Sequence, residues 1–232
     1  VNNPYKLDTL NAFKIKKGSV CKENGLNLNS LFGNIIGTKD FYGTSIPSAC
    51  DYDIGAFEDT SSYKKIDLTL LIAGFFNQST NIQIGDTVNL YLHGSSSPYS
   101  IIDSSKSFVD AYGKGKFIFQ SFKINGNYYI SAKHRNSIET WTSNTKLIYP
   151  GCKISYDFTN DSSKAYGNNL VRIGSKFCLF NGDVYQDAII DATDASMVEN
   201  DVSNSGYITT DLNGDQYLSL IHISEPTRLR RI

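Results

Sequence analysis

Short runs in which apolar and polar residues alternate dominate residues 63–178. Such alternation is typical of β-strands that bury one face and expose the other. The clearest runs are residues 66–72, 88–92, 117–119, 128–132 and 154–158. Turn-forming residues separate the runs, at residues 85–86, 113–115, 125–127 and 160–161, and residues 94–100 form a Ser/Pro-rich insertion. About seven strands in about 110 residues predict a β-sandwich.

Residues 1–58 show a different pattern, in which short apolar segments alternate with turns rich in asparagine, glycine and aspartate. The turns at 18–19 and 40–43 and the Asp-Ile-Gly-Ala-Phe-Glu ending at 53–58 resemble the closing coils of a secreted right-handed parallel β-helix. Its last coil would cap the open hydrophobic end of the solenoid. The acidic residues of this ending are explained as turn and edge residues rather than as a catalytic pair. Residues 59–62 form a polar linker.

Composition agrees with an extracellular, β-rich protein, since the 232 residues include 15 Tyr, 13 Phe, 18 Gly and one Met. The net charge of −1 argues against nucleic acid as a partner. The longest apolar run, residues 68–76, is interrupted by Thr69 and Gly74 and is too short to span a membrane. No nucleophile motif or phosphate-binding glycine loop is found, which favours a non-catalytic role.

The four cysteines lack the C-x-x-C spacing of zinc sites. Disulfides Cys21–Cys50 and Cys152–Cys178 would each lie within one predicted domain. Free, buried thiols are the alternative, and the sequence does not decide between them.

Near the C-terminus, Asp183, Asp187, Asp191 and Asp194 stand at positions 1, 5, 9 and 12 of a twelve-residue loop. This is the spacing of an EF-hand loop, in which oxygen atoms surround Ca²⁺. The carbonyl of Ile189 would be the ligand at position 7. The sequence therefore predicts a calcium site here, in what is called loop one below (residues 183–194).

Loop one departs from the usual pattern at three positions. Tyr185 stands at position 3, where Asp or Asn normally supplies an oxygen, and Ala188 stands at position 6, where glycine normally takes a positive φ. Asp194, at position 12, is one methylene shorter than the usual Glu. The alternative to a calcium site is a metal-free turn of the same shape. Ile190 is expected to point inward.

A second loop starts 28 residues later with Asp211, Asn213 and Asp215, which we assign as calcium ligands of a half-site. Positions 9 and 12 of this loop, called loop two below, fall on Ser219 and His222, which are poor calcium ligands.

Residues 182–218 resemble a dockerin-type repeat pair, on the basis of Gly-Asp-Val before loop one, Asp-x-x-Asp at its end and Asp-Leu-Asn-Gly-Asp in loop two. The resemblance implies a short helix over 192–200, with Ala195, Met197 and Val198 as candidate buried residues. It also implies docking to a protein partner, such as a cohesin-like protein or a cell-surface receptor. Residues 63–178 resemble the prealbumin-like domains appended to bacterial secreted proteins.

Both ends of the chain suggest a fragment. The chain begins with Val1 and no signal peptide, and residues 218–228 resemble a translated sequencing adapter, so we exclude residues 218–232 from fold reasoning as non-native. A genuine basic tail is the alternative. The predicted domains are thus a β-helix end (1–58), a β-sandwich (63–178) and a truncated dockerin-like module (179–217).

One polar cluster stands out in the sandwich, with His134, Arg135 and Glu139 close to the sole tryptophan, Trp141. Trp stacks on sugar rings, so the cluster is a candidate polysaccharide site. The preferred interpretation is that Trp141 anchors the core while Arg135 pairs with Glu139 on the surface.

Together these patterns predict a mainly β accessory region of a secreted or cell-surface protein that docks, anchors or adheres through calcium. The alternatives are the targeting part of a β-helix polysaccharide-degrading enzyme and a carbohydrate-binding sandwich.

Overall fold

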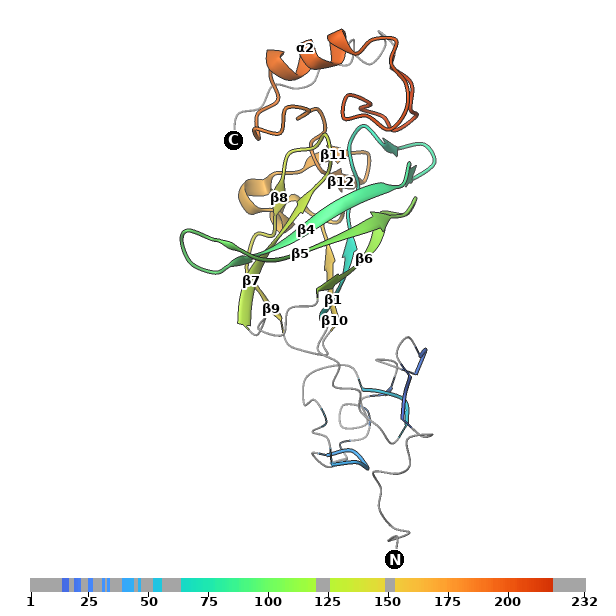
Figure 1. Cartoon of the computed structure of the whole chain (residues 1–232), viewed down its shortest axis with the longest axis vertical. Helices are drawn as coiled ribbons and strands as arrows, with labels where there is room; N and C mark the ends of the chain where they lie inside the picture. Colours follow the sequence, from blue (N-terminus) through green and yellow to red (C-terminus); the bar gives the residue numbers. More distant parts are fainter. Residues whose placement is uncertain are drawn as a thin grey trace, which may run out of the picture. The chain divides into compact units, whose positions relative to one another are not determined.

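The computed structural model describes residues 64–119, 126–148 and 153–218, together with scattered positions between 14 and 55 (Figure 1). Contacts divide the chain into two compact units. The first comprises residues 1–65, 120–125 and 148–153, and the second comprises residues 66–119, 126–147 and 154–232. The predicted β-helix end falls mostly outside the described residues, and among its described residues Gly25 and Tyr52 form an isolated antiparallel bridge.

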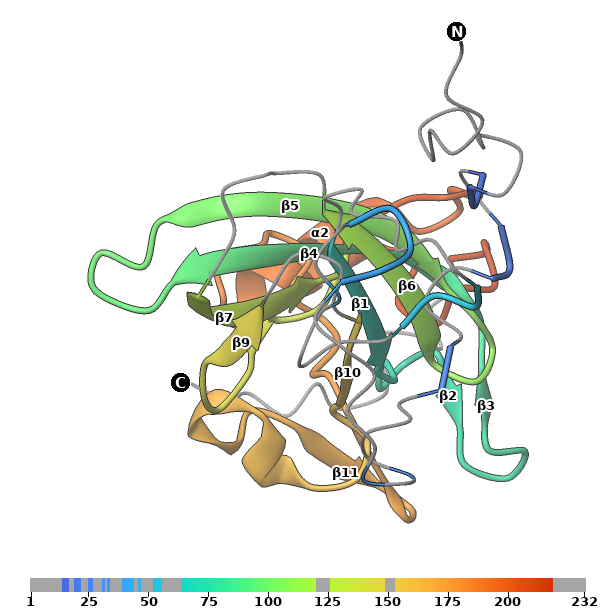
Figure 2. The ribbon, with the colours of Figure 1, turned by 90° about the horizontal axis from the view of Figure 1, so that it is seen from below.

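The described chain is mainly β, as predicted. Eight strands hydrogen-bond in one sheet in the order β10-β1-β6-β5-β4-β7-β8, with β9 paired to β7. The sheet curls, so that β4 and β5 run across the direction of β1 and β10 (Figure 2). The strands are β1 (Lys64–Thr69), β4 (Asp86–Gly94), β5 (Ile101–Val109), β6 (Lys114–Phe119), β7 (Gly126–Lys133), β8 (Thr140–Trp141), β9 (Lys146–Ile148) and β10 (Lys153–Asp157).

The core lies on one face of this sheet, where the strands bury alternate residues as their sequences predict. Full burial of one large apolar side chain stabilises the fold by about 1.5–3 kcal/mol. The large apolar side chains that are fully buried include Ile66, Leu68, Leu90, Leu92, Phe117, Phe119 and Ile130 from the four strands β1, β4, β6 and β7, and Phe158 just after β10.

Strand β5 has no counterpart among the predicted strands. Its residues from Asp103 to Ser107 are all polar, and the strand is largely exposed. It pairs with β4 over almost its whole length, for example Leu90 with Ser105, and it also pairs with β6. Backbone hydrogen bonds to β4 and β6 therefore stabilise this strand. Backbone pairing requires no alternation of apolar and polar residues, so the strand leaves no hydrophobic pattern in the sequence. The predicted insertion at 94–100 is the loop between β4 and β5.

Two small antiparallel sheets complete the β-structure: β2 (Phe76–Asn77) with β3 (Ile82–Gln83), and β11 (Val171–Ile173) with β12 (Lys176–Cys178). Two 3-10 turns, η3 (Ser162–Lys164) and η4 (Tyr166–Asn168), precede β11.

Cys178 is a buried free thiol that packs with Leu71 and Phe76, and Cys21 is also free. Of the two alternatives that the sequence left open, free thiols are therefore found at these two positions, while Cys50 and Cys152 lie outside the described residues. Apolar neighbours suffice to explain the burial of Cys178, and burial raises the pKa of its thiol to about 12.

Helix α2 (Ala192–Asn200) begins with a capping box, in which Asp191 accepts a hydrogen bond from the N–H of Thr193 and Asp194 accepts one from the N–H of Asp191. Val198 is buried and Met197 is half-buried, but Ala195 is exposed, contrary to expectation. The helix and the two loops lie at one end of the sheet (Figure 1).

Candidate calcium-loop pair and its contact with the sheet

The carboxylate of Asp183 organises the turn of loop one. It accepts hydrogen bonds from the N–H groups of Asp187, at 3.1 Å, and Ala188, at 3.2 Å. Asp187 in turn accepts one from the N–H of Ile189, at 2.9 Å. Acidic side chains at positions 1 and 5 thus hold the loop closed through its own backbone.

Asp194 closes the same loop from its far end. Its Oδ1 atom accepts hydrogen bonds from the N–H groups of Val184, at 2.8 Å, and Tyr185, at 2.9 Å. Its Oδ2 atom accepts one from the N–H of Asp191. Asp194 therefore links the start of the loop to the first turn of α2.

Loop two repeats two of the contacts of loop one. The N–H at position 6 again donates to the carboxylate at position 1, and the N–H at position 7 donates to the carboxylate at position 5. Asp211 accepts hydrogen bonds from the N–H groups of Gly214, at 2.8 Å, and Gln216, at 3.1 Å. Asp215 accepts one from the N–H of Tyr217, at 2.8 Å, as Asp187 does from Ile189. Asn213 accepts from the N–H of Asp215.

The two loops also share a backbone conformation. The φ angle is positive at position 4 (Gln186, +62°, and Gly214, +81°) and at position 6 (Ala188, +68°, and Gln216, +66°). Left-handed conformations are uncommon for residues other than glycine, so their recurrence at the same positions indicates a repeated loop rather than two unrelated turns.

The apolar positions of the loops match as well. Val184 and Leu212 stand at position 2, and Ile190 and Leu218 at position 8. Ile190 is buried, as expected, while Val184 and Leu218 pack with Val198 of α2 in one cluster that Leu212 also contacts. Leu218 thus lies in this cluster, although we had excluded residues from 218 onward as non-native.

The carboxylates of loop one suit a hard cation chemically, but they are not gathered around one point. Asp183 and Asp194 are buried, and among the described residues no Lys, Arg or His side chain pairs with either. Burial, and then the nearby charge of Asp194, raise the pKa of Asp183 against its backbone hydrogen bonds. Within the described ranges, no group of three acidic, histidine or cysteine side chains is arranged to hold a metal. Tyr185 and Ile189 are exposed.

A buried charge network joins loop two to the sheet, and we call it the Arg135 network. The Nε atom of Arg135 donates to Asp86, at 3.0 Å, and Nη2 donates to Asp211, at 3.3 Å. The Nε2 atom of His134 lies 3.0 Å from Asp86, and the hydroxyl of Tyr207 donates to the other oxygen of Asp86, at 2.7 Å. The network therefore consists of Asp86, His134, Arg135, Tyr207 and Asp211.

Neighbouring amides reinforce this contact. Asn136 donates from Nδ2 to the carbonyl oxygen of Asp211, at 2.8 Å, and its Oδ1 atom lies 2.9 Å from Nδ1 of His134. Both ring nitrogens of His134 are therefore within hydrogen-bond distance of side-chain oxygen atoms. Asn181 donates to the carbonyl oxygen of Leu212.

Burial disfavours the charged form of Asp86, but hydrogen bonds from His134, Tyr207 and the Thr87 N–H, with the charge of His134, dominate and hold its pKa well below the usual range.

The predicted polar cluster around Trp141 is divided between two places. Arg135 pairs with Asp86 and Asp211, so among the described residues the predicted Arg135–Glu139 pair does not form. Glu139 instead lies 3.8 Å from Nε2 of His93. Trp141 stacks on the ring of His93, with centroids 3.9 Å apart.

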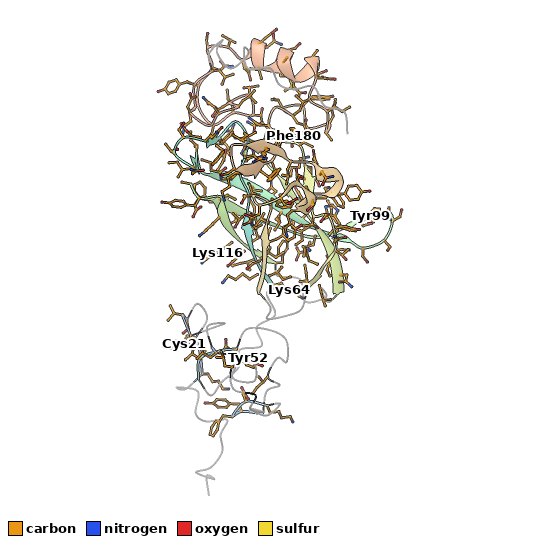
Figure 3. The ribbon with its side chains drawn as sticks, turned by 180° about the vertical axis from the view of Figure 1, so that it is seen from behind. Cys21, Tyr52, Lys64, Tyr99, Lys116 and Phe180 are labelled. Carbon is orange, nitrogen blue, oxygen red and sulfur yellow. The ribbon has the colours of Figure 1, made fainter. Side chains whose placement is uncertain are left out.

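Around Trp141 lies a cluster of rings on the face of β4 and β7 opposite the core. Tyr99 and Tyr129 lie 6.5 Å and 6.2 Å from Trp141, centroid to centroid. Tyr99 is 45% exposed and comes from the loop between β4 and β5, where Figure 3 labels it. Trp141 is therefore partly exposed rather than an anchor of the core.

Sequence reasoning missed Asp86, Asn136, Asn181 and Tyr207 as residues of this region. Asp86 was assigned to a turn, and it becomes significant only because folding brings it to Tyr207, 121 positions away.

Comparisons with known proteins leave the family open. No protein-family model and no curated protein matches the sequence. Two chains from crystal structures of a type II cohesin–X-dockerin complex of Acetivibrio cellulolyticus overlap part of the fold. An N-terminal interface mutant is 14% identical, covering 69% of this chain and 88% of that chain at a TM-score of 0.37. A C-terminal interface mutant is 12% identical, covering 68% and 90% at 0.40. Identities and TM-scores this low assign neither fold nor function.

Proposed function

We propose that this chain is a non-catalytic accessory region of a secreted or cell-surface protein, and that it docks to a protein partner through residues 183–218. The supporting observation is the repeat itself: two loops share acidic positions, positive φ angles, hydrogen bonds and buried apolar positions. A repeated pair of loops around a small core is the arrangement that the dockerin resemblance implies.

The candidate ligands of loop one are all oxygen atoms, and calcium is an ion that prefers oxygen ligands. Asp183, Asp187, Asp191, Asp194 and the carbonyl of Ile189 would hold the ion. Tyr185 would contribute least, since its side chain is exposed. Bound calcium would relieve the repulsion between the buried carboxylates of Asp183 and Asp194.

Calorimetric titration of the chain with calcium tests this proposal. We expect one ion to bind, and binding to be lost in Asp183→Asn. Glu199→Gln is the matched control, because Glu199 is an exposed carboxylate on α2 outside both loops. Calcium at a hundredfold excess over Kd would then stabilise the chain by about 2.7 kcal/mol. Unchanged binding in Asp183→Asn would exclude loop one as the site.

The partner is tested separately, with an immobilised type II cohesin as the probe. Docking through the loop pair predicts retention of the chain in calcium and release by a chelator. Calcium binding without retention would keep the metal site but exclude this class of partner, leaving a cell-surface receptor as the alternative.

A second candidate function is carbohydrate binding by the sandwich, which the cluster around Trp141 favours. Partly exposed aromatic rings can stack on the apolar faces of sugars, and the carboxylate of Glu139 can accept hydrogen bonds from hydroxyl groups.

Affinity electrophoresis in gels containing soluble neutral polysaccharides tests this function. Retardation that is lost in Tyr99→Ala, whose ring is 45% exposed and comes from the loop between β4 and β5, would support it. Equal mobility in every gel would exclude it for those polysaccharides.

A further inference from the structure

The carboxylate of Asp211 is fully buried at position 1 of loop two, where a calcium ligand would stand. Two backbone N–H groups donate hydrogen bonds to this carboxylate, but a buried carboxylate also needs a compensating positive charge. The guanidinium of Arg135 provides this charge through its hydrogen bond to Oδ2. Loop two therefore already contains a cation in the described structure.

Loop one differs in this respect. Its equivalent carboxylate, Asp183, accepts a similar pair of backbone hydrogen bonds and is as deeply buried. Its nearby charge is that of Asp194, and among the described residues it has no basic partner. Two loops with the same backbone thus differ in how their first carboxylate is neutralised.

Arg135 is held firmly in this position. Asp86 binds its Nε atom, and its guanidinium lies over the rings of Tyr207, at 4.5 Å, and Phe75, at 5.4 Å. Its side chain is only 10% exposed. The charge is therefore in place before any metal arrives, and moving it would break the ion pair of Arg135 with Asp211 and its ion pair with Asp86, which also pairs with His134.

The backbone of loop two is fixed to the sheet at the same place. Asn136 and Asn181 bind the carbonyl oxygens of Asp211 and Leu212. A Cβ atom added to Gly74 would collide with the carbonyl oxygen of Leu212, so the two segments are in close contact.

We propose that the guanidinium of Arg135 replaces calcium at loop two, so that this loop keeps its shape without metal and only loop one responds to calcium. Calcium binding by loop one rests on the proposed function, whereas the neutralisation of Asp211 by Arg135 does not. Loop two then acts as a permanent attachment to the sheet, and loop one as the calcium-dependent half of the pair.

The first test uses thermal unfolding of the chain in excess chelator. We expect Arg135→Gln and Asp211→Asn each to lower Tm by roughly 10 °C, and the double variant to lower it little further, because both remove the same ion pair. Arg172→Gln is the control, since Arg172 is exposed and donates to the carbonyl oxygen of Gly174, two residues away. Additive losses from the two single variants would overturn the proposal.

A second measurement needs no variant that risks misfolding. In chelator, the amide protons of Gly214 and Gln216, which bind Asp211, should remain protected from hydrogen exchange. Exchange at the rate of an unfolded loop until calcium is added would overturn the proposal.

Calcium titration separates this inference from the proposed function. One ion that survives Asp211→Asn but not Asp183→Asn supports both. No bound calcium, with protected amides in chelator, overturns the function of loop one but supports the role of Arg135. A second ion that is lost in Asp211→Asn overturns that role alone.

Discussion

The hydroxyl of Tyr207 donates a 2.7 Å hydrogen bond to Oδ1 of Asp86, across 121 positions of sequence. Tyr207 belongs to the segment that follows α2, and Asp86 is the first residue of β4. The bond therefore joins the helical end of the chain to the sheet, and it lies beside the guanidinium of Arg135, which stacks on the ring of Tyr207.

Removing this hydroxyl should weaken the attachment measurably. We expect Tyr207→Phe to lower the free energy of unfolding by about 1 kcal/mol, because a hydrogen bond to a charged acceptor is lost at a partly exposed site. Chemical denaturation measures the change, with Tyr217→Phe as the control, since Tyr217 is the more exposed. Equal effects of the two substitutions would show that the bond to Asp86 contributes nothing specific.

Stability at acid pH should depend on Asp86. Its pKa in the folded state lies below that of an unfolded aspartate, near 3.9, so the folded state resists protonation that the unfolded chain accepts. The contribution is fully present above about pH 4 and is lost as pH falls toward the folded pKa. Between pH 4 and 2, unfolding free energy should fall more steeply in the wild type than in Asp86→Asn, by up to about 1.4 kcal/mol per pH unit. Equal slopes of unfolding free energy against pH in the wild type and in Asp86→Asn would contradict this.

Substitution of Ala188 should improve loop one. Ala188 is exposed and adopts φ of +68°, a conformation that costs about 1–2 kcal/mol for a residue with a Cβ atom. Glycine also raises the conformational entropy of the unfolded chain, which offsets part of this gain. Ala188→Gly should therefore stabilise the loop by about 0.5–1 kcal/mol and strengthen calcium binding. Ala195→Gly, on the exposed face of α2, should have the opposite effect on stability. Weaker calcium binding by Ala188→Gly would show that the site needs a stiff loop more than a relaxed one.

The thiol of Cys178 should be inert in the folded protein. Burial raises its pKa to about 12, so the reactive thiolate is scarce near neutral pH, and packing against Leu71 and Phe76 blocks reagents. Iodoacetamide at pH 8 should alkylate Cys178 more than about a thousandfold faster after denaturation, as peptide mass spectrometry would show. Cys21, which is half-buried, is the internal comparison. Rapid labelling of native Cys178 would mean that β12 opens readily.

The sequence predicted those parts of the fold in which side chains alone determine the structure. Strands β1, β4, β6, β7 and β10 lie where alternation placed strands, because one face of each is buried. Helix α2 occupies the predicted residues, since Asp191 and Asp194 provide its capping box. Strand β5 could not be predicted in this way, because its residues are mostly polar and its backbone is paired on both sides.

The acidic spacing of loop one and loop two was visible in the sequence, but the contacts of Arg135 were not. Its neighbour Glu139 offered a local ion pair, whereas the observed partners Asp86 and Asp211 are 49 and 76 positions away. Charges alone do not identify such partners, since only the fold brings β4, the segment after β7 and loop two together.

The segment between β12 and loop one leaves no slack between the sheet and the loop pair. Leu179 donates its N–H to Leu71, Ile138 donates to Phe180, and Gly182 donates to Asn136. A partner that pulled on the loops would therefore load the hydrogen bonds of residues 71–73 and 136–138 at once, instead of stretching a free tether. This part of the chain would transmit tension as a stiff joint, and its mechanical strength would be that of these hydrogen bonds to the segments that follow β1 and precede β8.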